Sequence, residues 1–392
     1  MYKSFVSPIR IVSGEGAVNE IPALLKSYQA GRVMVFADPG VLDAGIVAPL
    51  EDQLKEAGVI YEIYSDLKPE PPAEIGKNAL QALKSFDADF VIGIGGGSSL
   101  DIAKAVSVLH GNEGSIENYL NLSGDKSLAN RGLPKLLIPT TAGTGAEVTD
   151  ISVFSLEGTK DVITHEFLLA DVAVVDPDLT MTVPPKVTAA TGVDALTHAV
   201  EAYISVNSTP LTDALALDAM ERIAKNIRTA VWNGSNKEAR AQMSWGSMTA
   251  GLSFYNAGVA GVHALAYPLG GLFKIPHGES NAVLLPYIFD YIWPSCMEKM
   301  GVIAERIGAN TEGLSKREAA IAGVRELKNI VEDVGIPSTL EQFGIKESDL
   351  VNLAESGEKQ TRLLARSPKP YSYQDILGRY EAAYAGILEI DK

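Results

Sequence analysis

The pattern of apolar and polar positions changes about halfway along the chain. Up to about residue 180, short apolar runs alternate with longer amphipathic stretches, as expected where strands and helices follow one another. This alternation predicts a parallel, doubly wound sheet covered by helices. The candidate strands are VMVFAD (33–38), IYEIYS (60–65), FVIGI (90–94), KLLIPT (135–140) and VAVVDP (172–177).

Beyond Pro184 and Pro185 the chain is rich in Ala, Leu, Met and Glu, and strand candidates disappear. A chain of 392 residues is long enough for two domains, each with its own core. We therefore expect an α/β domain over residues 1–183 and an all-α domain over residues 184–392.

Four residues of the helical half have the spacing of a metal site. Asp194 and His198 stand four residues apart, so on a helix both side chains rise from one face. His263 lies in a second helical stretch, and His277 follows a proline where a helix or turn begins. Alternatively, Asp194 and His198 form a helix-surface pair and the other two histidines pack in the core. Because the chain has only five histidines, three in this pattern favour the metal site.

The chemistry of these donors narrows the choice of metal. Three neutral imidazoles and one carboxylate suit iron(II), zinc, cobalt or nickel better than calcium or magnesium. The remaining histidines, His110 and His165, have no partners of this kind, and we interpret them as structural.

A glycine-rich turn in the first half predicts a phosphate cradle. The strand over 90–94 runs into Gly95, Gly96 and Gly97, and a helix is expected to start near Ser98. Glycines let the backbone approach an anion, and the first N–H groups of a helix supply the positive end of its dipole. Asp101, three residues after Ser98, suggests a capping box. The turn is neither GxGxxG nor the GxxxxGK[ST] of nucleotide hydrolases.

Two further segments point to a dinucleotide. An apolar strand runs into hydroxyl residues suited to phosphate, ribose or amide groups, namely Thr140, Thr141, Thr144 and Thr149. Another strand ends at Asp38, where a carboxylate can accept from a ribose diol and repel a 2′-phosphate, which favours NAD over NADP. The alternative for Asp38 is an ordinary loop aspartate before Pro39 and Gly40.

Taken together, these residues resemble the iron-containing, group III alcohol dehydrogenases over essentially the whole chain. The matching motifs are GGGSSLDIAK, PTTAGTGAEVT, ATGVDALTHAVEAY, VHALAYPLGG and IPHGESNAVLLP. The resemblance implies an N-terminal dinucleotide-binding domain and a helical domain, an architecture shared with dehydroquinate synthase, with NAD and a divalent metal between them. It also implies a homodimer or larger assembly, iron(II) before zinc, and the ligands Asp194, His198, His263 and His277. The implied NAD contacts are Gly95, Gly96, Gly97, Ser98, Asp101, Thr140, Thr141, Thr144, Thr149, Lys160 and Leu179.

The sequence departs from the family in two places. Many members carry a histidine four residues after the third ligand, where this chain has Tyr267, whose reference pKa near ~10 makes it a poor proton carrier at neutral pH. Near the C-terminus, a segment with Arg362 and Arg366 replaces the usual small, cysteine-containing stretch. These arginines either meet an anionic substrate or are solvated surface residues. By resemblance, the apolar side of the substrate pocket is formed by Ile151, Phe254 and Leu363.

Composition restricts the partners. The formal net charge of −16, without a basic tract, disfavours nucleic acid and anionic membranes. The lone Cys296 rules out an internal disulfide and fits a reducing compartment. No window has the length of a signal-peptide core or membrane span. We therefore expect a cytoplasmic enzyme with a small-molecule substrate.

The predicted function is a metal-dependent NAD(H) alcohol dehydrogenase or aldehyde reductase, which transfers hydride between nicotinamide C4 and a short-chain primary alcohol or its aldehyde. The first alternative is a reductase of a small anionic aldehyde carrying a carboxylate, sulfonate or phosphonate. More distant alternatives are a dehydroquinate synthase-like lyase, which needs more basic residues near the metal, and a non-catalytic NAD sensor, which does not need four ligands.

Overall fold

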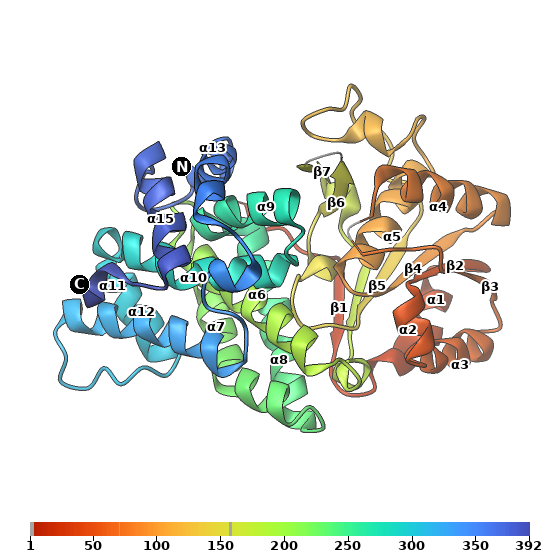
Figure 1. The fold of residues 1–392 in the computed structure, drawn as a ribbon. Helices are drawn as coiled ribbons and strands as arrows, with labels where there is room; N and C mark the ends of the chain where they lie inside the picture. The colour runs from red at the N-terminus through yellow and green to blue at the C-terminus, as the bar shows by residue number, and fades with distance from the viewer. Residues whose placement is uncertain (1–3, 70, 157–158) are drawn as a thin grey trace. The chain divides into compact units, whose positions relative to one another are not determined.

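The computed structural model describes residues 4–69, 71–156 and 159–392 (Figure 1). The chain divides into two compact units, residues 6–183 and residues 184–392, and Ser4 and Phe5 group with the second. The described part of the second unit contains helices and no strands, whereas the first alternates strands with helices. The predicted fold class, α/β followed by all-α, is confirmed.

The first unit is built on six parallel strands in the order β1-β8-β5-β4-β2-β3. All five predicted strands are present, within two residues of their predicted bounds. The strands are β1 (Arg10–Ser13), β2 (Arg32–Ala37), β3 (Ile60–Tyr64), β4 (Phe90–Gly95), β5 (Lys135–Pro139) and β8 (Val172–Val175). The helices of this unit are α1 (Ile21–Ser27), α2 (Pro39–Asp43), α3 (Ala48–Ala57), α4 (Ala73–Phe86) and α5 (Gly97–Leu109).

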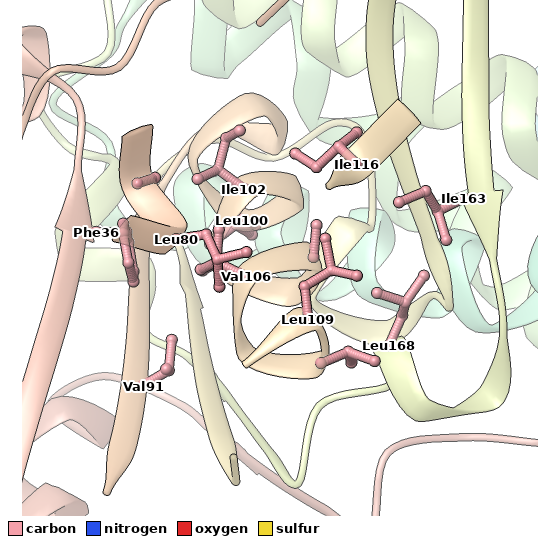
Figure 2. Close-up of a cluster of buried hydrophobic side chains, with 14 of the residues drawn as sticks. Phe36, Leu80, Val91, Leu100, Ile102, Val106, Leu109, Ile116, Ile163 and Leu168 are labelled. Atoms are coloured by element: carbon pink, nitrogen blue, oxygen red, sulfur yellow. The ribbon is translucent and has the colours of Figure 1, made fainter. Parts of the chain in front are cut away.

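The two faces of this sheet bury different side chains. Successive residues of a strand point to opposite faces, so Phe36 and Val91 pack with α4 and α5 on one face (Figure 2). Val35 and Ile92 pack with α1 and α3 on the other. Because both faces are covered, the inner strands β2, β4, β5 and β8 are buried and apolar along almost their whole length, whereas the edge strands β1 and β3 are partly exposed.

The strand order reverses between β2 and β4. From β2 the chain adds β3 on one side, and it then returns to place β4 on the other side. In an open α/β sheet, ligands bind beyond the carboxyl ends of the strands at such a reversal. Ala37 is paired with Ile94, so the residues that follow them, Asp38 and Gly95, lie side by side.

A two-stranded antiparallel hairpin, which the sequence pattern does not predict, follows β5. It consists of β6 (Ile151–Leu156) and β7 (Thr159–Thr164). Its strands carry many polar residues and pair only with each other within the described sheets, so they lack the continuous apolar run of the parallel strands.

The second unit begins with α6 at Pro185, directly after Pro184 at the N-cap. α6 packs against α7, α8 and α10, so its residues from Gly192 to Ile204 are all buried. No described helix combines the length and apolar character needed to cross a bilayer. The helices are α6 (Pro185–Ile204), α7 (Pro210–Trp232), α8 (Lys237–Ala257), α9 (Gly261–Phe273), α10 (His277–Ile292), α11 (Met297–Arg306), α12 (Lys316–Asp333), α13 (Leu350–Glu358), α14 (Thr361–Leu364) and α15 (Tyr373–Ala385).

Candidate metal centre and cofactor site

Asp194 and His198 lie in the buried part of α6, one helical turn apart. The four-residue spacing places His198 Nε2 3.9 Å from Asp194 Oδ1. A carboxylate this deeply buried requires compensating partners, because an isolated charge is very costly in an apolar interior. The pair is buried and is therefore not the helix-surface pair of the alternative interpretation.

His263 and His277 reach the same carboxylate oxygen from two other helices. His263 lies in the first turn of α9, and its Nε2 is 3.8 Å from Asp194 Oδ1. His277 is the first residue of α10, and its Nε2 is 3.7 Å from the same atom. Ligand atoms of Asp194, His263 and His277 all lie within 4.8 Å of one another. His198 is outside this compact group of three and contacts it through Asp194 and through its ring contact with His263.

Stacked rings orient two of these imidazoles. The ring of His198 lies between Phe254, at a centroid distance of 4.2 Å, and His263, at 4.7 Å, with interplanar angles of 18° and 20°. Such a stack restricts rotation of the imidazoles about their side-chain bonds. Phe254, predicted in the substrate pocket, is thus adjacent to the metal-ligand candidates.

The donor set fits a divalent metal. A tetrahedral ion with bonds of about 2.0–2.2 Å holds its donor atoms about 3.3–3.6 Å apart, close to the 3.7 to 3.9 Å that separate Asp194 Oδ1 from Nε2 of each imidazole. Burial opposes ionisation of Asp194, but the three imidazoles and the Asn281 amide outweigh it and hold the pKa of this carboxyl below its ordinary value. The residues present therefore offer an ionised carboxylate and three ring nitrogens.

Two residues of this centre are not predicted from the sequence. Asn281 donates from Nδ2 to Asp194 Oδ1 over 2.7 Å, and the same nitrogen lies 3.1 Å from His263 Nε2 and 3.3 Å from His277 Nε2. Glu201 Oε2 lies 2.6 Å from His263 Nδ1, within hydrogen-bonding distance. Both follow a predicted ligand at helical spacing, Asn281 four residues after His277 and Glu201 three after His198, and this spacing is the signal that could have found them.

Four other predicted residues of the second unit lie around the centre. Tyr267 is one turn after His263, its ring centroid is 6.1 Å from that of His277, and burial raises the pKa of its hydroxyl. Leu363 is buried and packs in one cluster with Phe254 and Tyr267. The Arg366 guanidinium lies against Gly258, where an added Cβ would come within 2.6 Å of Arg366 Nη1. Arg362 is exposed.

The glycine turn of the first unit joins a strand to a helix, as the sequence predicts. Gly95 ends β4 with φ +148°, and α5 begins at Gly97 with Gly96 at the N-cap. A Cβ on Gly95 would meet Ser99 Oγ at 2.7 Å and Asp38 Oδ2 at 3.0 Å, so only glycine fits there. Ser99 Oγ donates to Asp38 Oδ2 over 3.0 Å, and Asp38 also caps α2. Asp38 therefore lies beside the start of α5.

The predicted threonines divide into two groups. Thr141 and Thr144 lie next to the turn, since a Cβ on Gly96 would be 3.9 Å from Thr141 Oγ1 and one on Gly97 would be 3.0 Å from Thr144 Oγ1. Thr140 and Thr149 are buried. Two of the contacts rest on the resemblance alone: Lys160 lies on β7, and Leu179 packs in the core on one face of the sheet.

The predicted capping box between Ser98 and Asp101 is wrong. Gly96 is the N-cap of α5 without a side-chain cap, and Asp101 instead accepts from Val153 N over 3.0 Å. Its other oxygen is 2.9 Å from Nζ of the fully buried Lys104. The carboxylate turns inward because only there can it neutralise a buried ammonium. Lys104 also donates to the carbonyl oxygens of Ala146 and Ile151, which ties α5 to β6.

A second buried carboxylate near Lys104 gives a pH-dependent stability. Burial raises the pKa of Glu147 from its ordinary 4.5 to about 7. The folded state then binds a proton more tightly than the unfolded state, so the stability of the protein falls as pH rises between about 4.5 and 7. We expect Glu147→Gln to remove this loss, which raises the free energy of unfolding by on the order of 3 kcal/mol near pH 8 and changes it little near pH 4.

Urea unfolding at the two pH values measures this effect. The exposed Glu117→Gln serves as control and should show the same small change at both. A gain for Glu147→Gln that is equal at the two pH values would contradict the assignment, because packing alone does not titrate.

Sequence comparisons agree with this geometry. Residues 8–177 match the family described as iron-containing alcohol dehydrogenase, and residues 188–384 match the C-terminal part of the Fe-containing alcohol dehydrogenase family. The chain is 54% identical over 375 residues to the long-chain-alcohol dehydrogenase 1 of Geobacillus thermodenitrificans (strain NG80-2), covering 96% of this chain and 95% of that protein.

Other relatives and solved structures cover the same length. The sulfoacetaldehyde reductase of Bilophila wadsworthia (strain 3_1_6) is 35% identical, over 96% of this chain and 97% of that protein. A solved structure of a 1,3-propanediol oxidoreductase has a TM-score of 0.94 at 34% identity, covering 98% of this chain and 100% of that one. Matching sequence over both units and matching fold along the whole chain show that this protein belongs to the iron-containing alcohol dehydrogenase family of oxidoreductases.

Proposed function

We propose that this chain is a metal-dependent, NAD(H)-linked alcohol dehydrogenase that interconverts aliphatic primary alcohols and their aldehydes. The observation that carries the proposal is the convergence of three imidazole nitrogens on one buried carboxylate oxygen, Asp194 Oδ1. Asp194, His198, His263 and His277 would hold the metal, for which we propose iron(II), with zinc as the second choice.

The metal and the nicotinamide would supply what side chains cannot, a Lewis acid for the substrate oxygen and an acceptor for hydride. The residues of the chain would bind the metal and keep its ligands oriented. Asp194 provides the negative charge, and the stack of Phe254 and His198 keeps the imidazoles in place. Tyr267 keeps its proton near neutral pH, so its hydroxyl is suited to donate a hydrogen bond and not to carry protons away.

The proposed NAD site combines the start of α5 with Asp38. The first N–H groups of α5, with Thr141 and Thr144, favour the pyrophosphate. Asp38 is oriented by Ser99 Oγ and by Val41 N, and its oxygens retain lone pairs for a ribose diol. Its charge would repel a 2′-phosphate, which supports NAD as the cofactor.

The side chains next to the centre favour an apolar substrate. Phe254, Leu363 and Tyr267 form one cluster with Val259 and Ala264. Such a surface gains free energy from each methylene that it covers. Relatives named for long-chain alcohols and for 1,3-propanediol support a primary alcohol or aldehyde, and the first of these extends the predicted short-chain range to longer chains.

One observation favours the alternative of an anionic aldehyde. The partly buried Arg366 interacts electrostatically with Tyr267 and Glu201, both next to the metal-ligand candidates. A relative at 35% identity is named as a sulfoacetaldehyde reductase. Because a guanidinium binds a sulfonate or carboxylate strongly, Arg366 would be the anchor in this case.

The test is NADH oxidation by protein reconstituted anaerobically with iron(II) or zinc, with a chelator-treated control. Aldehydes of increasing chain length are compared with carboxylate, sulfonate and phosphonate analogues. We expect metal-dependent turnover with kcat/KM for neutral aldehydes higher by at least about tenfold, roughly 1.4 kcal/mol of transition-state binding.

Two other outcomes would contradict the preference for neutral aldehydes. A preference for anionic aldehydes that is lost in Arg366→Ala would establish the alternative. Absence of turnover with NADH binding intact would reject the dehydrogenase and point to a lyase or to an NAD sensor.

A further inference from the structure

Glu201 is a buried carboxylate that bonds to His263 through the ring nitrogen that does not face Asp194. It lies on α6 seven residues after Asp194 and three after His198, on the same face of the helix, and it is 1% exposed. Its Oε2 is 2.6 Å from His263 Nδ1, and its Oε1 accepts from Val262 N over 2.6 Å. Two adjacent residues of α9 are thus held by one carboxylate.

We propose that Glu201 is a positioning residue that fixes the tautomer of His263 and thereby sets the affinity of the centre for its metal; this rests on the proposed function. A carboxylate can only accept, so His263 Nδ1 carries the proton and Nε2 keeps its lone pair. The surroundings of Nε2 agree, because the amide nitrogen of Asn281, a donor, lies 3.1 Å away. A neutral imidazole in this tautomer is the form that binds a metal.

Glu201 also fixes the position of His263 relative to α6. Val262 belongs to the first turn of α9, whose N–H groups have no acceptor within the helix, and the N-cap Ala260 provides no side-chain cap. Glu201 supplies the missing acceptor from α6, and a negative charge is favourable at this end of the helix dipole. The bond therefore anchors the start of α9 to the helix that carries Asp194 and His198.

Charge balance is a third reason to expect that Glu201 sets the affinity of the centre for its metal. Asp194 and Glu201 provide two buried negative charges beside three imidazoles. With neutral imidazoles, these two charges balance one divalent cation, whereas with Glu201 neutralised the same assembly would keep a net positive charge in an apolar interior. Glu201 should therefore favour a doubly charged ion.

The test compares Glu201→Gln with Glu147→Gln, a matched change of a buried carboxylate in the other unit. Glutamine has one acceptor oxygen, so with this oxygen on Val262 N its amide nitrogen faces His263 Nδ1 as a donor and no longer favours a proton there. Zinc and iron(II) dissociation constants are measured by competition with a chromophoric chelator, and NADH binding by fluorescence. We expect Glu201→Gln to weaken metal binding by about 10- to 100-fold, with NADH binding unchanged, and Glu147→Gln to bind metal like the wild type.

A second measurement does not depend on how the variant folds. In zinc-loaded wild-type protein labelled with 15N-histidine, two-bond correlations report the tautomer of each of the five histidines, and His263→Asn identifies the signal of His263. We expect His263 protonated at Nδ1. The opposite tautomer, or a folded Glu201→Gln with an unchanged metal dissociation constant, would overturn the proposal. If the wild type itself bound no metal, the proposed function would fail instead.

Discussion

Replacing His277 with alanine is expected to abolish turnover while NAD binding is retained, and the same holds for His263→Ala. Each change removes one of the imidazoles around Asp194 Oδ1. The loss of a Lewis acid costs several kcal/mol of transition-state stabilisation, so we expect kcat to fall by at least about three orders of magnitude. His277 is the more informative position, because its side chain is 33% exposed and its removal disturbs packing little.

The measurements are metal content of the purified variant, NADH binding by fluorescence and aldehyde-dependent NADH oxidation. His110→Ala is the matched control, since this histidine is the C-cap of α5 in the other unit and is not one of the metal-ligand candidates, and it should keep metal and activity. A His277→Ala protein that retained both metal and wild-type turnover would reject the ligand assignment.

Lys104→Ala is expected to destabilise the protein strongly. Lys104 is fully buried, 2.9 Å from Asp101, and it donates to the carbonyl oxygens of Ala146 and Ile151. Its removal leaves a buried carboxylate without its cation, a loss of about 3–5 kcal/mol. In a unit of this size the melting temperature should fall by on the order of 10 °C.

Thermal and urea unfolding, followed by circular dichroism, measure this loss. Lys55→Ala removes an exposed pair with Asp52, separated by 3.4 Å, and should cost less than about 1 kcal/mol. The double change of Lys104→Met with Asp101→Asn should recover part of the stability, because no uncompensated charge then remains. An effect of Lys104→Ala as small as that of Lys55→Ala would show that the buried pair contributes little.

The features best predicted from the sequence are those that depend on residues close together along the chain. The inner parallel strands are recognisable because both faces of the sheet are covered, which requires long apolar runs such as that of β4, whereas the short, partly exposed edge strand β1 is not predicted. The β6–β7 hairpin escapes prediction because its polar strands carry no such run. The capping box is a wrong prediction because the spacing of Ser98 and Asp101 allows it, while the competing partner Lys104 is recognisable only once its burial is known.

By itself, the sequence determined five of the six parallel strands and the change to helices after Pro184, the helical spacing of Asp194 and His198, and the glycine at position 95 that the turn requires. These follow from backbone geometry within a few residues. Only the tertiary structure decided which distant groups meet: Asn281 with Asp194, 87 residues apart, and Glu201 with His263, 62 apart. The reason is that a buried polar group takes the partner that best offsets its lost hydration, and that partner is set by how helices pack, which local spacing does not encode.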